Sequence, residues 1–243
     1  MKRFLQIIYA TYMWTVVVLC TVTTATFIIV CAFILYPFDH NRQIANIGAE
    51  VWGKMIFAAN PFWKLKMQGL GYLRKHKGYI LVVNHLSAMD IVCLFCMGKN
   101  FKWVAKDSLF RIPFFGWAMS ALGYVSLKRG EHGSIRDSYR ESMKWLNRGV
   151  SVLIFPEGTR SSSGKLGTFK NGAFKLAAQT KKPIVPIVLT GTREIIQRGS
   201  SIPALRARVK LKVLKPIETT HYQEKQFVEL MDLVRSKMLE HIP

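Results

Sequence analysis

The sequence predicts an α/β protein built on a mixed, mostly parallel sheet flanked by helices, with an N-terminal membrane-anchoring segment of two helices. Three observations predict this fold class. After Pro61, short β-branched runs alternate with helical segments, which is typical of one sheet with helices on both faces. A long uncharged apolar run lies near the N-terminus, and a segment with amphipathic helical spacing follows it.

Composition limits the classes of protein that this chain can represent. It has 243 residues, of which 35 are Lys or Arg and 14 are Asp or Glu, giving a formal net charge of +21. The length allows one sizeable core, or one domain and an appendage. The charge indicates an anionic partner, such as nucleic acid, an acidic membrane surface or a phosphorylated substrate. The high apolar content excludes a solvated basic tail protein, and the four cysteines lie in apolar segments as small filler.

The N-terminal segment is predicted to be an apolar helix over residues 4–36 and an amphipathic helix over residues 42–60. The first of these contains no charged residue, and about 20 apolar residues are enough to cross a bilayer. It is too long for the apolar region of a signal peptide. The sequence fits spanning the membrane and inserting into one leaflet equally well. We assign residues 1–63 to the membrane anchor and residues 64–243 to the α/β domain.

The α/β domain contains six candidate strands with helices between and after them. The predicted strands are Tyr79–Val83, Phe101–Ala105, Tyr124–Leu127, Val150–Phe155, Ile184–Leu189 and Val209–Leu214. The predicted helices are Ala88–Met97, Ile135–Arg148, Gly172–Thr180 and Gln223–His241. In open α/β sheets, ligands bind outside the carboxyl ends of the strands. Polar residues that directly follow a buried strand are therefore the candidates for a functional site.

A histidine and an aspartate follow the first of these strands. His85 lies where the strand stops, and Asp90 lies one turn into the next helix. A carboxylate on one imidazole nitrogen fixes the tautomer and orientation of a general base. Alternatively, Ser87 caps the helix, Asp90 completes a capping box, and His85 is only a polar loop residue. This stretch alone does not decide between the two interpretations.

A second polar cluster follows the strand Val150–Phe155. Gly158 allows the backbone to approach a ligand closely, and Arg160 offers a planar fork that suits a phosphate. Glu157 can accept a hydrogen bond from a substrate hydroxyl or hold the arginine in place. Read alone, the segment is a turn with a surface Glu–Arg pair. Its occurrence with His85 at the end of another strand indicates a functional site.

These motifs together resemble those of the glycerolipid acyltransferase family, specifically the bacterial 1-acylglycerol-3-phosphate acyltransferases. The matching stretches are His-x4-Asp at His85 and Asp90, Phe-Pro-Glu-Gly-Thr-Arg at Phe155–Arg160, Gly123 with Arg129, Val185-Pro186-Ile187, Lys106 ahead of Ile112-Pro113-x-x-Gly116, and Phe169-Lys170-x-Gly172. The likeness covers about residues 64–215. The departures are small. Leu86 stands where the family often has a polar residue, and Lys128 where an acidic or amide residue is common; both concern substrate preference more than reaction type.

The resemblance implies transfer of a fatty acyl group from an acyl thioester to the sn-2 hydroxyl of 1-acylglycerol 3-phosphate. The product is phosphatidic acid, and residues 64–243 are then a catalytic acyltransferase domain. His85 and Asp90 are the implied catalytic dyad, with the histidine as general base. The implied binding residues for the phosphate and glycerol of the acceptor are Lys106, Arg129, Glu157, Gly158, Thr159 and Arg160.

The resemblance also implies partners and a location. Acyl-CoA or acyl-acyl-carrier-protein is the expected co-substrate, lysophosphatidic acid the acceptor, and no cofactor or metal is expected. Anionic membrane lipids are expected partners. Nucleic acid is not, because the basic residues are dispersed and lack a recognised binding motif. Most of the positive charge follows residue 63, which places the catalytic domain on the cytoplasmic side of the cell inner membrane.

The chemistry expected from these residues is direct transfer. The chain has no Gly-x-Ser-x-Gly nucleophile elbow, so an acyl-enzyme has little support, and a cap is the preferred role for Ser87. Backbone amides near Gly158 are candidate donors for the oxyanion. Two alternatives remain. The acceptor is another molecule, such as glycerol 3-phosphate or another lysolipid, or the chain is a non-enzymatic basic module that binds membrane or nucleic acid.

Overall fold

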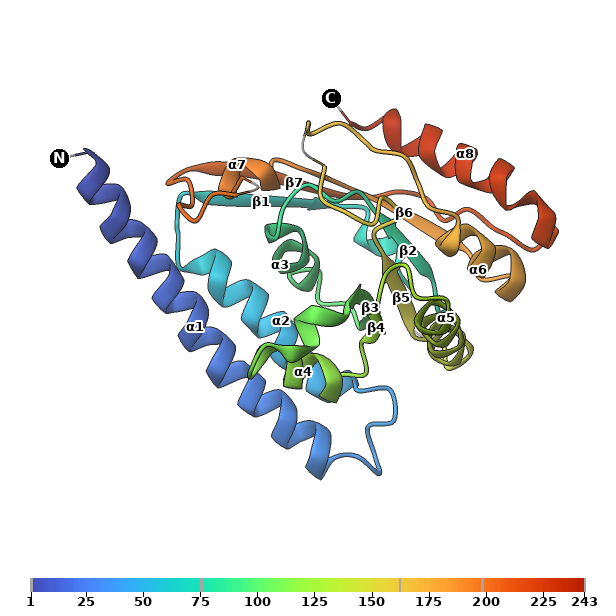
Figure 1. Cartoon of the computed structure of the whole chain (residues 1–243), viewed down its shortest axis with the longest axis horizontal. Coiled ribbons are helices and arrows are strands. Elements are labelled where there is room, and N and C mark those ends of the chain that lie inside the picture. Colours follow the sequence, from blue (N-terminus) through green and yellow to red (C-terminus); the bar gives the residue numbers. More distant parts are fainter. Residues whose placement is uncertain (1, 75–76, 162, 198, 243) are drawn as a thin grey trace.

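The computed structural model describes residues 2–74, 77–161, 163–197 and 199–242. Within them, one sheet has the strand order β1-β7-β6-β2-β5-β3-β4 (Figure 1). The strands are β1 Trp63–Gln68, β2 Ile80–Val83, β3 Phe101–Lys106, β4 Val125–Leu127, β5 Ser151–Ile154, β6 Ile184–Thr190 and β7 Ala207–Val213. The α-helices are α1 Lys2–Ile34, α2 Gln43–Ala58, α3 Met89–Phe95, α4 Phe115–Ala121, α5 His132–Asn147, α6 Gly172–Thr180, α7 Thr192–Ile195 and α8 Phe227–Leu239. Short 3-10 helices are η1 Leu70–Tyr72, η2 Asp107–Arg111 and η3 Glu224–Gln226.

Most neighbouring strands of the sheet are parallel. Parallel pairing joins β2 to β5 and β6, and β3 to β4 and β5. β1 is parallel to β7, and β7 is antiparallel to β6. The mixed, mostly parallel sheet predicted from the sequence is thus confirmed. Because β2 to β6 all run the same way, their carboxyl ends meet at one edge of the sheet, which we call the carboxyl edge.

All six predicted strands are present, with ends that differ by one or two residues from the prediction. The sequence analysis missed the edge strand β1, although its residues alternate between apolar and polar, which is the pattern of a strand with one solvent-facing side. It also missed the short helix α4. The predicted helix Ala88–Met97 is shorter in the structure, where α3 ends at Phe95.

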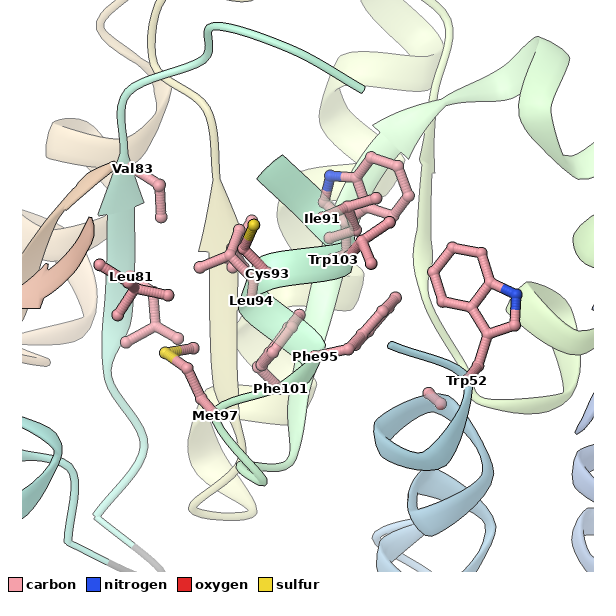
Figure 2. Close-up of a cluster of buried hydrophobic side chains, with 14 of the residues drawn as sticks. Trp52, Leu81, Val83, Ile91, Cys93, Leu94, Phe95, Met97, Phe101 and Trp103 are labelled. Atoms are coloured by element: carbon pink, nitrogen blue, oxygen red, sulfur yellow. The ribbon is translucent and has the colours of Figure 1, made fainter. Parts of the chain in front are cut away.

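The two faces of the sheet are covered by different helices. In β2, Leu81 and Val83 belong to a core cluster shared with α1, α2, α3 and α4. Ile80 and Val82 point to the other face, into a cluster shared with α5, α6 and α8. This alternation is the two-residue repeat of a strand buried on both faces. Figure 2 shows Leu81 and Val83 pointing toward Cys93 and Leu94 of α3.

The N-terminal helices form a hairpin that lies on the first of these faces (Figure 1). The predicted helices 4–36 and 42–60 correspond to α1 and α2, whose ends differ slightly from the prediction. Asp39, in the loop before α2, accepts hydrogen bonds from the first backbone N–H groups of this helix, including those of Gln43 at 2.6 Å and Ile44 at 2.8 Å. The carboxylate therefore fixes the start of α2.

The hairpin shares its core with the α/β domain. The ring of Trp52 in α2 meets that of Phe95 in α3 edge to face, with 5.8 Å between the ring centroids. At the other end of the hairpin, the Trp14 indole N–H donates to the Ser201 carbonyl at 2.7 Å. The boundary between residues 63 and 64 stays a prediction, and this shared core argues against independent folding of residues 64–243. By length and composition, α1 is the helix of the described chain that could cross a membrane.

Candidate active site

The site is built on the end of β2, the middle strand of the seven-stranded sheet. All four residues of β2 are buried. The next residue, Asn84, is also buried, and its side-chain amide pairs with the backbone of Leu189 on β6. It donates to the Leu189 carbonyl at 2.8 Å and accepts from the Leu189 N–H at 2.7 Å. This two-way pairing holds the start of the β2–α3 loop against its neighbouring strand.

His85 and Asp90 are in direct contact, which is the first of the two interpretations that the stretch alone left open. The distance from His85 Nδ1 to Asp90 Oδ2 is 2.7 Å, and Asp90 is fully buried at the start of α3. The same oxygen accepts from the backbone N–H groups of Leu86 at 2.6 Å and Ser87 at 2.9 Å. The carboxylate therefore orients the imidazole and also shapes the loop between the two residues. With Nδ1 engaged, Nε2 is the ring nitrogen available to a substrate.

The structure decides against Ser87 as the cap of α3. The residue before the helix is Ala88, and it provides no side-chain hydrogen bond. The Ser87 hydroxyl instead donates to the Ile196 carbonyl at 2.9 Å, beyond the end of β6. Its contact with the Met89 N–H, at 3.4 Å, is long. Ser87 thus attaches the loop to the segment after α7, and the Asp90 carboxylate serves the backbone N–H groups and the histidine together.

The ring of Phe155 stacks on the imidazole of His85, a contact that the sequence analysis missed. The rings of His85 and Phe155 are stacked, with 4.1 Å between centroids and 20° between planes. Trp103 of β3 meets Phe155 edge to face at 6.4 Å. Stacked rings restrict rotation of the imidazole about its side-chain bonds. Phe155 directly follows β5, and β5 pairs with β2. The contact could therefore be predicted only if this strand pairing were already known.

Glu157 joins the β2–α3 loop to the loop after β5. Its Oε1 accepts from the His85 backbone N–H at 2.8 Å, and its Oε2 accepts from the Gly167 N–H at 2.9 Å. The His85 carbonyl in turn accepts from the Ser161 N–H at 2.8 Å. Burial raises the pKa of the Glu157 carboxyl, although these two N–H groups act in the opposite direction. Both carboxylate oxygens of Glu157, which was predicted to contact the substrate, therefore accept hydrogen bonds from backbone N–H groups.

Gly158 and Arg160 lie on the turn that follows Glu157. Gly158 has φ +70°, and a Cβ added there would lie 2.9 Å from Lys170 Cε. The turn thus favours glycine for its backbone conformation, whereas the flexible end of the Lys170 side chain can move away from a Cβ. The Gly158 N–H donates to the Phe155 carbonyl at 3.0 Å, so this amide is not free to serve as an oxyanion donor. Thr159 is exposed and Arg160 is half-buried.

Lys106 and Arg129 lie further along the carboxyl edge. Lys106 ends β3, and Arg129 follows the end of β4; both residues are exposed. In the sheet order, β5 separates β2 from β3, and β4 lies beyond β3. At about 4.8 Å per strand, the backbone of β3 lies roughly 10 Å from that of β2 and the backbone of β4 roughly 15 Å from it. Lys106 is thus the nearer of these two cations to the His85 strand.

The arrangement is suited to removing a proton from a hydroxyl group beside an anionic group. A buried carboxylate on Nδ1 leaves Nε2 of His85 to accept the proton, and 18% of the histidine side chain is exposed. Cations follow the ends of β3, β4 and β5 at the same edge. A substrate that carries both a hydroxyl group and an anionic group therefore matches this edge of the sheet.

A solved structure has the same fold. The crystal structure titled as the 1-acyl-sn-glycerophosphate (LPA) acyltransferase PlsC from Thermotoga maritima superposes with a TM-score of 0.81, covering 100% of this chain and 97% of that chain. The two sequences are 24% identical. At this level of identity the likeness concerns the fold.

Curated relatives have higher sequence identity. A chloroplastic 1-acyl-sn-glycerol-3-phosphate acyltransferase of Arabidopsis thaliana is 40% identical over 200 residues, which cover 80% of this chain and 56% of the relative. A 1-acyl-sn-glycerol-3-phosphate acyltransferase of Saccharomyces cerevisiae is 34% identical over 171 residues, covering 68% of this chain and 55% of the relative. The chain thus spans little more than half the length of these relatives.

The family itself is established by the central part of the chain. The family model described as Acyltransferase matches residues 64–190. These residues include β1 from its second residue, all of β2 to β6, the His85–Asp90 pair and the loop from Glu157 to Arg160. Since the match extends over more than half of the sequence, the chain belongs to the acyltransferase family.

Proposed function

We propose that this protein transfers a fatty acyl group from an acyl thioester to the sn-2 hydroxyl of 1-acylglycerol 3-phosphate, giving phosphatidic acid. The observation that carries the proposal is the 2.7 Å contact between His85 Nδ1 and buried Asp90 at the carboxyl edge. The names of the relatives support the choice of acceptor. The cations after β3, β4 and β5 support an acceptor that carries a phosphate.

In the proposed reaction, His85 Nε2 takes the proton of the sn-2 hydroxyl as its oxygen attacks the thioester carbonyl carbon. The new C–O bond forms, the C–S bond breaks, and the proton leaves with the thiolate as a thiol. Asp90 holds the imidazole in the tautomer with hydrogen on Nδ1 and stabilises its charged form. A thiol with a pKa of about 8.5 is a good leaving group and needs little acid catalysis.

The acceptor phosphate is assigned to the cations of the carboxyl edge. Arg160 follows β5 directly beside β2, and its guanidinium fork suits two phosphate oxygens. Lys106 and Arg129 add positive charge at increasing distance from His85. For Glu157 we propose a positioning role instead of the glycerol contact expected from sequence, because both its oxygens accept backbone N–H groups. Gly158 and Thr159 then shape the turn that presents Arg160.

The setting proposed for this reaction is a membrane surface. The apolar helix α1 and the net charge of +21 favour an anionic bilayer. We place the catalytic domain on the cytoplasmic side of the inner membrane, with acyl-CoA or acyl-acyl-carrier-protein as donor. The expectations that the reaction uses no cofactor or metal and that nucleic acid is not a partner belong to the same proposal.

Purified full-length protein offered a panel of acceptors with each donor tests the proposal. The panel is lysophosphatidate, glycerol 3-phosphate, a lysophospholipid with a substituted phosphate and monoacylglycerol, with mass spectrometry to identify the products. We expect lysophosphatidate to give the highest kcat/KM with a new ester at the sn-2 position. A higher value for another acceptor would reassign the substrate, and no transfer to any of the four would contradict the reaction.

A further inference from the structure

Three large apolar side chains are exposed around the start of α4, two in the loop that precedes this helix and one in its first turn. They are Ile112, Phe114 and Trp117, which we call the α4 patch. Trp117 is 52% exposed, and its ring lies 5.1 Å from that of Phe114. Exposed apolar residues occur singly on most protein surfaces, whereas a cluster of this kind marks a contact site.

The opposite side of α4 is part of the core. Phe115, Ala118 and Met119 line a small apolar cavity together with Thr24 and Ile28 of α1. Figure 1 shows α4 lying beside the C-terminal half of α1. Helix α4 is therefore fixed against the N-terminal hairpin, and its remaining side faces outward. The side chains of the α4 patch are therefore exposed while the other side of the helix is packed in the core.

The hairpin also turns apolar side chains outward. Those with large exposed fractions include Phe27, Val30 and Phe33 of α1, and Ile44, Ile47, Val51 and Met55 of α2. The helices α1, α2 and α4 all pack on the same face of the sheet. The α4 patch thus continues the apolar outer surface of a layer whose longest helix is apolar enough to cross a membrane.

The residues beside the α4 patch have the composition of a membrane–water interface. Arg111 precedes Ile112, its side chain is 76% exposed, and it pairs with Asp107 at 2.7 Å. Lys106 is exposed a few residues earlier. Tryptophan and other amphipathic rings collect at the level of lipid headgroups, and basic side chains beside them reach anionic lipids. This combination of rings and cations favours a lipid surface over an apolar protein partner.

The backbone at Phe114 supports a dedicated role for this turn. Phe114 has φ 59° and ψ −59°, a conformation that a bulky residue rarely adopts. Such conformations persist where the surrounding structure imposes them, and they concentrate at functional sites. Here the unusual conformation lies between Pro113 and the first residue of α4. The rings of Phe114 and Trp117, on either side of that first residue, are both exposed.

We propose that the α4 patch inserts into the bilayer interface as a third membrane contact, beside α1 and α2. Since Lys106 ends β3 and η2 leads directly from it to the patch, insertion turns the carboxyl edge toward the membrane surface. A lysophospholipid would then reach His85 with its acyl chain still in the bilayer. The insertion itself does not depend on the reaction, whereas this consequence rests on the proposed function.

Ile112 and Ile135 make a matched pair for testing the insertion, because each is an isoleucine that is 45% exposed. Ile135 lies on α5, which packs on the opposite face of the sheet. In full-length protein with Cys31 replaced by alanine, we would introduce Ile112→Cys, Trp117→Cys or Ile135→Cys and attach an environment-sensitive fluorophore. The probe membranes are vesicles of phosphatidylcholine with a third phosphatidylglycerol.

We expect the emission from the labels at positions 112 and 117 to rise and shift to shorter wavelength on vesicles, and to be quenched by lipids with a nitroxide near the headgroup. The label at position 135 should not respond. Equal responses at all three positions, or none at positions 112 and 117, would overturn the proposal. A shift that depends on protein concentration without vesicles would assign the patch to a second copy of the chain and also overturn it.

An activity measurement then separates insertion from the reaction. Ile112→Glu should lower the turnover of vesicle-bound acceptor about tenfold or more, and leave turnover of a short-chain, water-dissolved acceptor unchanged. Ile135→Glu should change neither rate. If Ile112→Glu lowers both rates equally, the patch serves the fold and not the membrane. If wild-type protein turns over neither acceptor, the reaction fails, and the fluorescence result still decides on insertion.

Discussion

The two parts of the candidate active site differ in how firmly the protein itself holds them. At the end of β2, Asp90 and Glu157 are buried, and their oxygens accept hydrogen bonds from His85 and from backbone N–H groups. At the ends of β3 and β4, Lys106 and Arg129 are exposed cations on the surface. We call these the catalytic part and the cationic part, and Arg160, half-buried, belongs to the second.

This difference indicates a division of work. A general base must be held in one orientation before the substrate arrives, because its proton transfer depends on geometry. Cations that bind a phosphate can adjust to it, since charge–charge attraction depends weakly on direction. Changes in the catalytic part should therefore lower kcat, and changes in the cationic part should raise KM for the acceptor. The following predictions test that comparison from the largest effect to the smallest.

The largest effect is expected for His85→Ala. General-base catalysis contributes about 10² to 10⁴ in rate, so kcat should fall by about that factor while KM for lysophosphatidate changes little. The His85 side chain is 18% exposed, and without it the Asp90 carboxylate still accepts hydrogen bonds from the backbone N–H groups of Leu86 and Ser87. Circular dichroism and thermal unfolding serve as controls for the fold. A folded variant with wild-type kcat would remove His85 from the chemistry.

Asp90→Asn is expected to reduce kcat by about 10² or more, and to lower stability as well. Its Oδ2 accepts from His85 Nδ1 and from the backbone N–H groups of Leu86 and Ser87. The amide oxygen of asparagine can take the place of Oδ2 and accept these bonds, but it carries no charge, and a hydrogen bond to a charged group contributes about 1.5–3 kcal/mol where a neutral one contributes about 0.5–1.5 kcal/mol. Steady-state kinetics and urea unfolding measure the two effects. Loss of stability with an unchanged kcat would leave Asp90 a purely structural residue.

Glu157→Gln should lower kcat by about tenfold, with KM for the acceptor unchanged. The glutamine oxygen can accept one of the two N–H groups, from His85 or Gly167, but not both, and one lost bond of about 1.4 kcal/mol corresponds to a factor of ten. Glu141→Gln on the exposed side of α5 is the matched control. A raised KM with an unchanged kcat would restore the glycerol contact that the sequence suggested.

For Arg160→Ala, we expect KM for lysophosphatidate to rise by about tenfold and kcat to stay within about twofold, since a charge-assisted hydrogen bond contributes about 1.5–3 kcal/mol. Acceptors without a phosphate should show no change. Arg140→Ala on α5, where the arginine pairs with Asp137 at 2.7 Å, controls for the loss of one positive charge. An effect on kcat alone would transfer Arg160 to the catalytic part.

The smallest effect concerns the pH dependence of stability. Burial raises the pKa of the Glu157 carboxyl in the folded chain. Stability from a group with a raised pKa is present below its unfolded pKa and is lost as the pH rises through the folded value. The ordinary pKa of Glu is about 4.3. As the pH rises above this value, the free energy of unfolding should therefore decrease less in Glu157→Gln than in wild type. Urea unfolding over a pH series measures this, and parallel profiles would contradict it.

The sequence was most informative where the site depends on neighbouring residues. The His85–Asp90 contact could be predicted because a loop of five residues can join the two side chains, and the strand ends could be placed because β-branched runs stop there. Lys106 and Arg129 were named from the family resemblance, and the ends of β3 and β4 place them at this edge. The carboxyl edge was thus predictable before any strand order was known.

Contacts across the sheet could not be predicted in this way. Glu157 meets the His85 backbone, and Phe155 meets its ring, only because β5 lies next to β2, and the order of strands is not encoded in local pattern. Lys102 is another case. It is fully buried in β3, and its Nζ lies 4.6 Å from the centre of the Trp145 ring. Burial lowers the pKa of Lys102 to about 7, which the sequence Phe-Lys-Trp alone does not indicate.

The most direct measurement is the acceptor-saturation curve of His85→Ala beside that of Arg160→Ala, recorded with one thioester donor and lysophosphatidate. We predict that the His85→Ala curve loses its maximum rate and keeps its midpoint. The Arg160→Ala curve should keep its maximum and move to about tenfold higher acceptor concentration. A folded His85→Ala protein that reaches the wild-type maximum rate would contradict the assignment of His85 as the base that receives the proton of the acceptor hydroxyl.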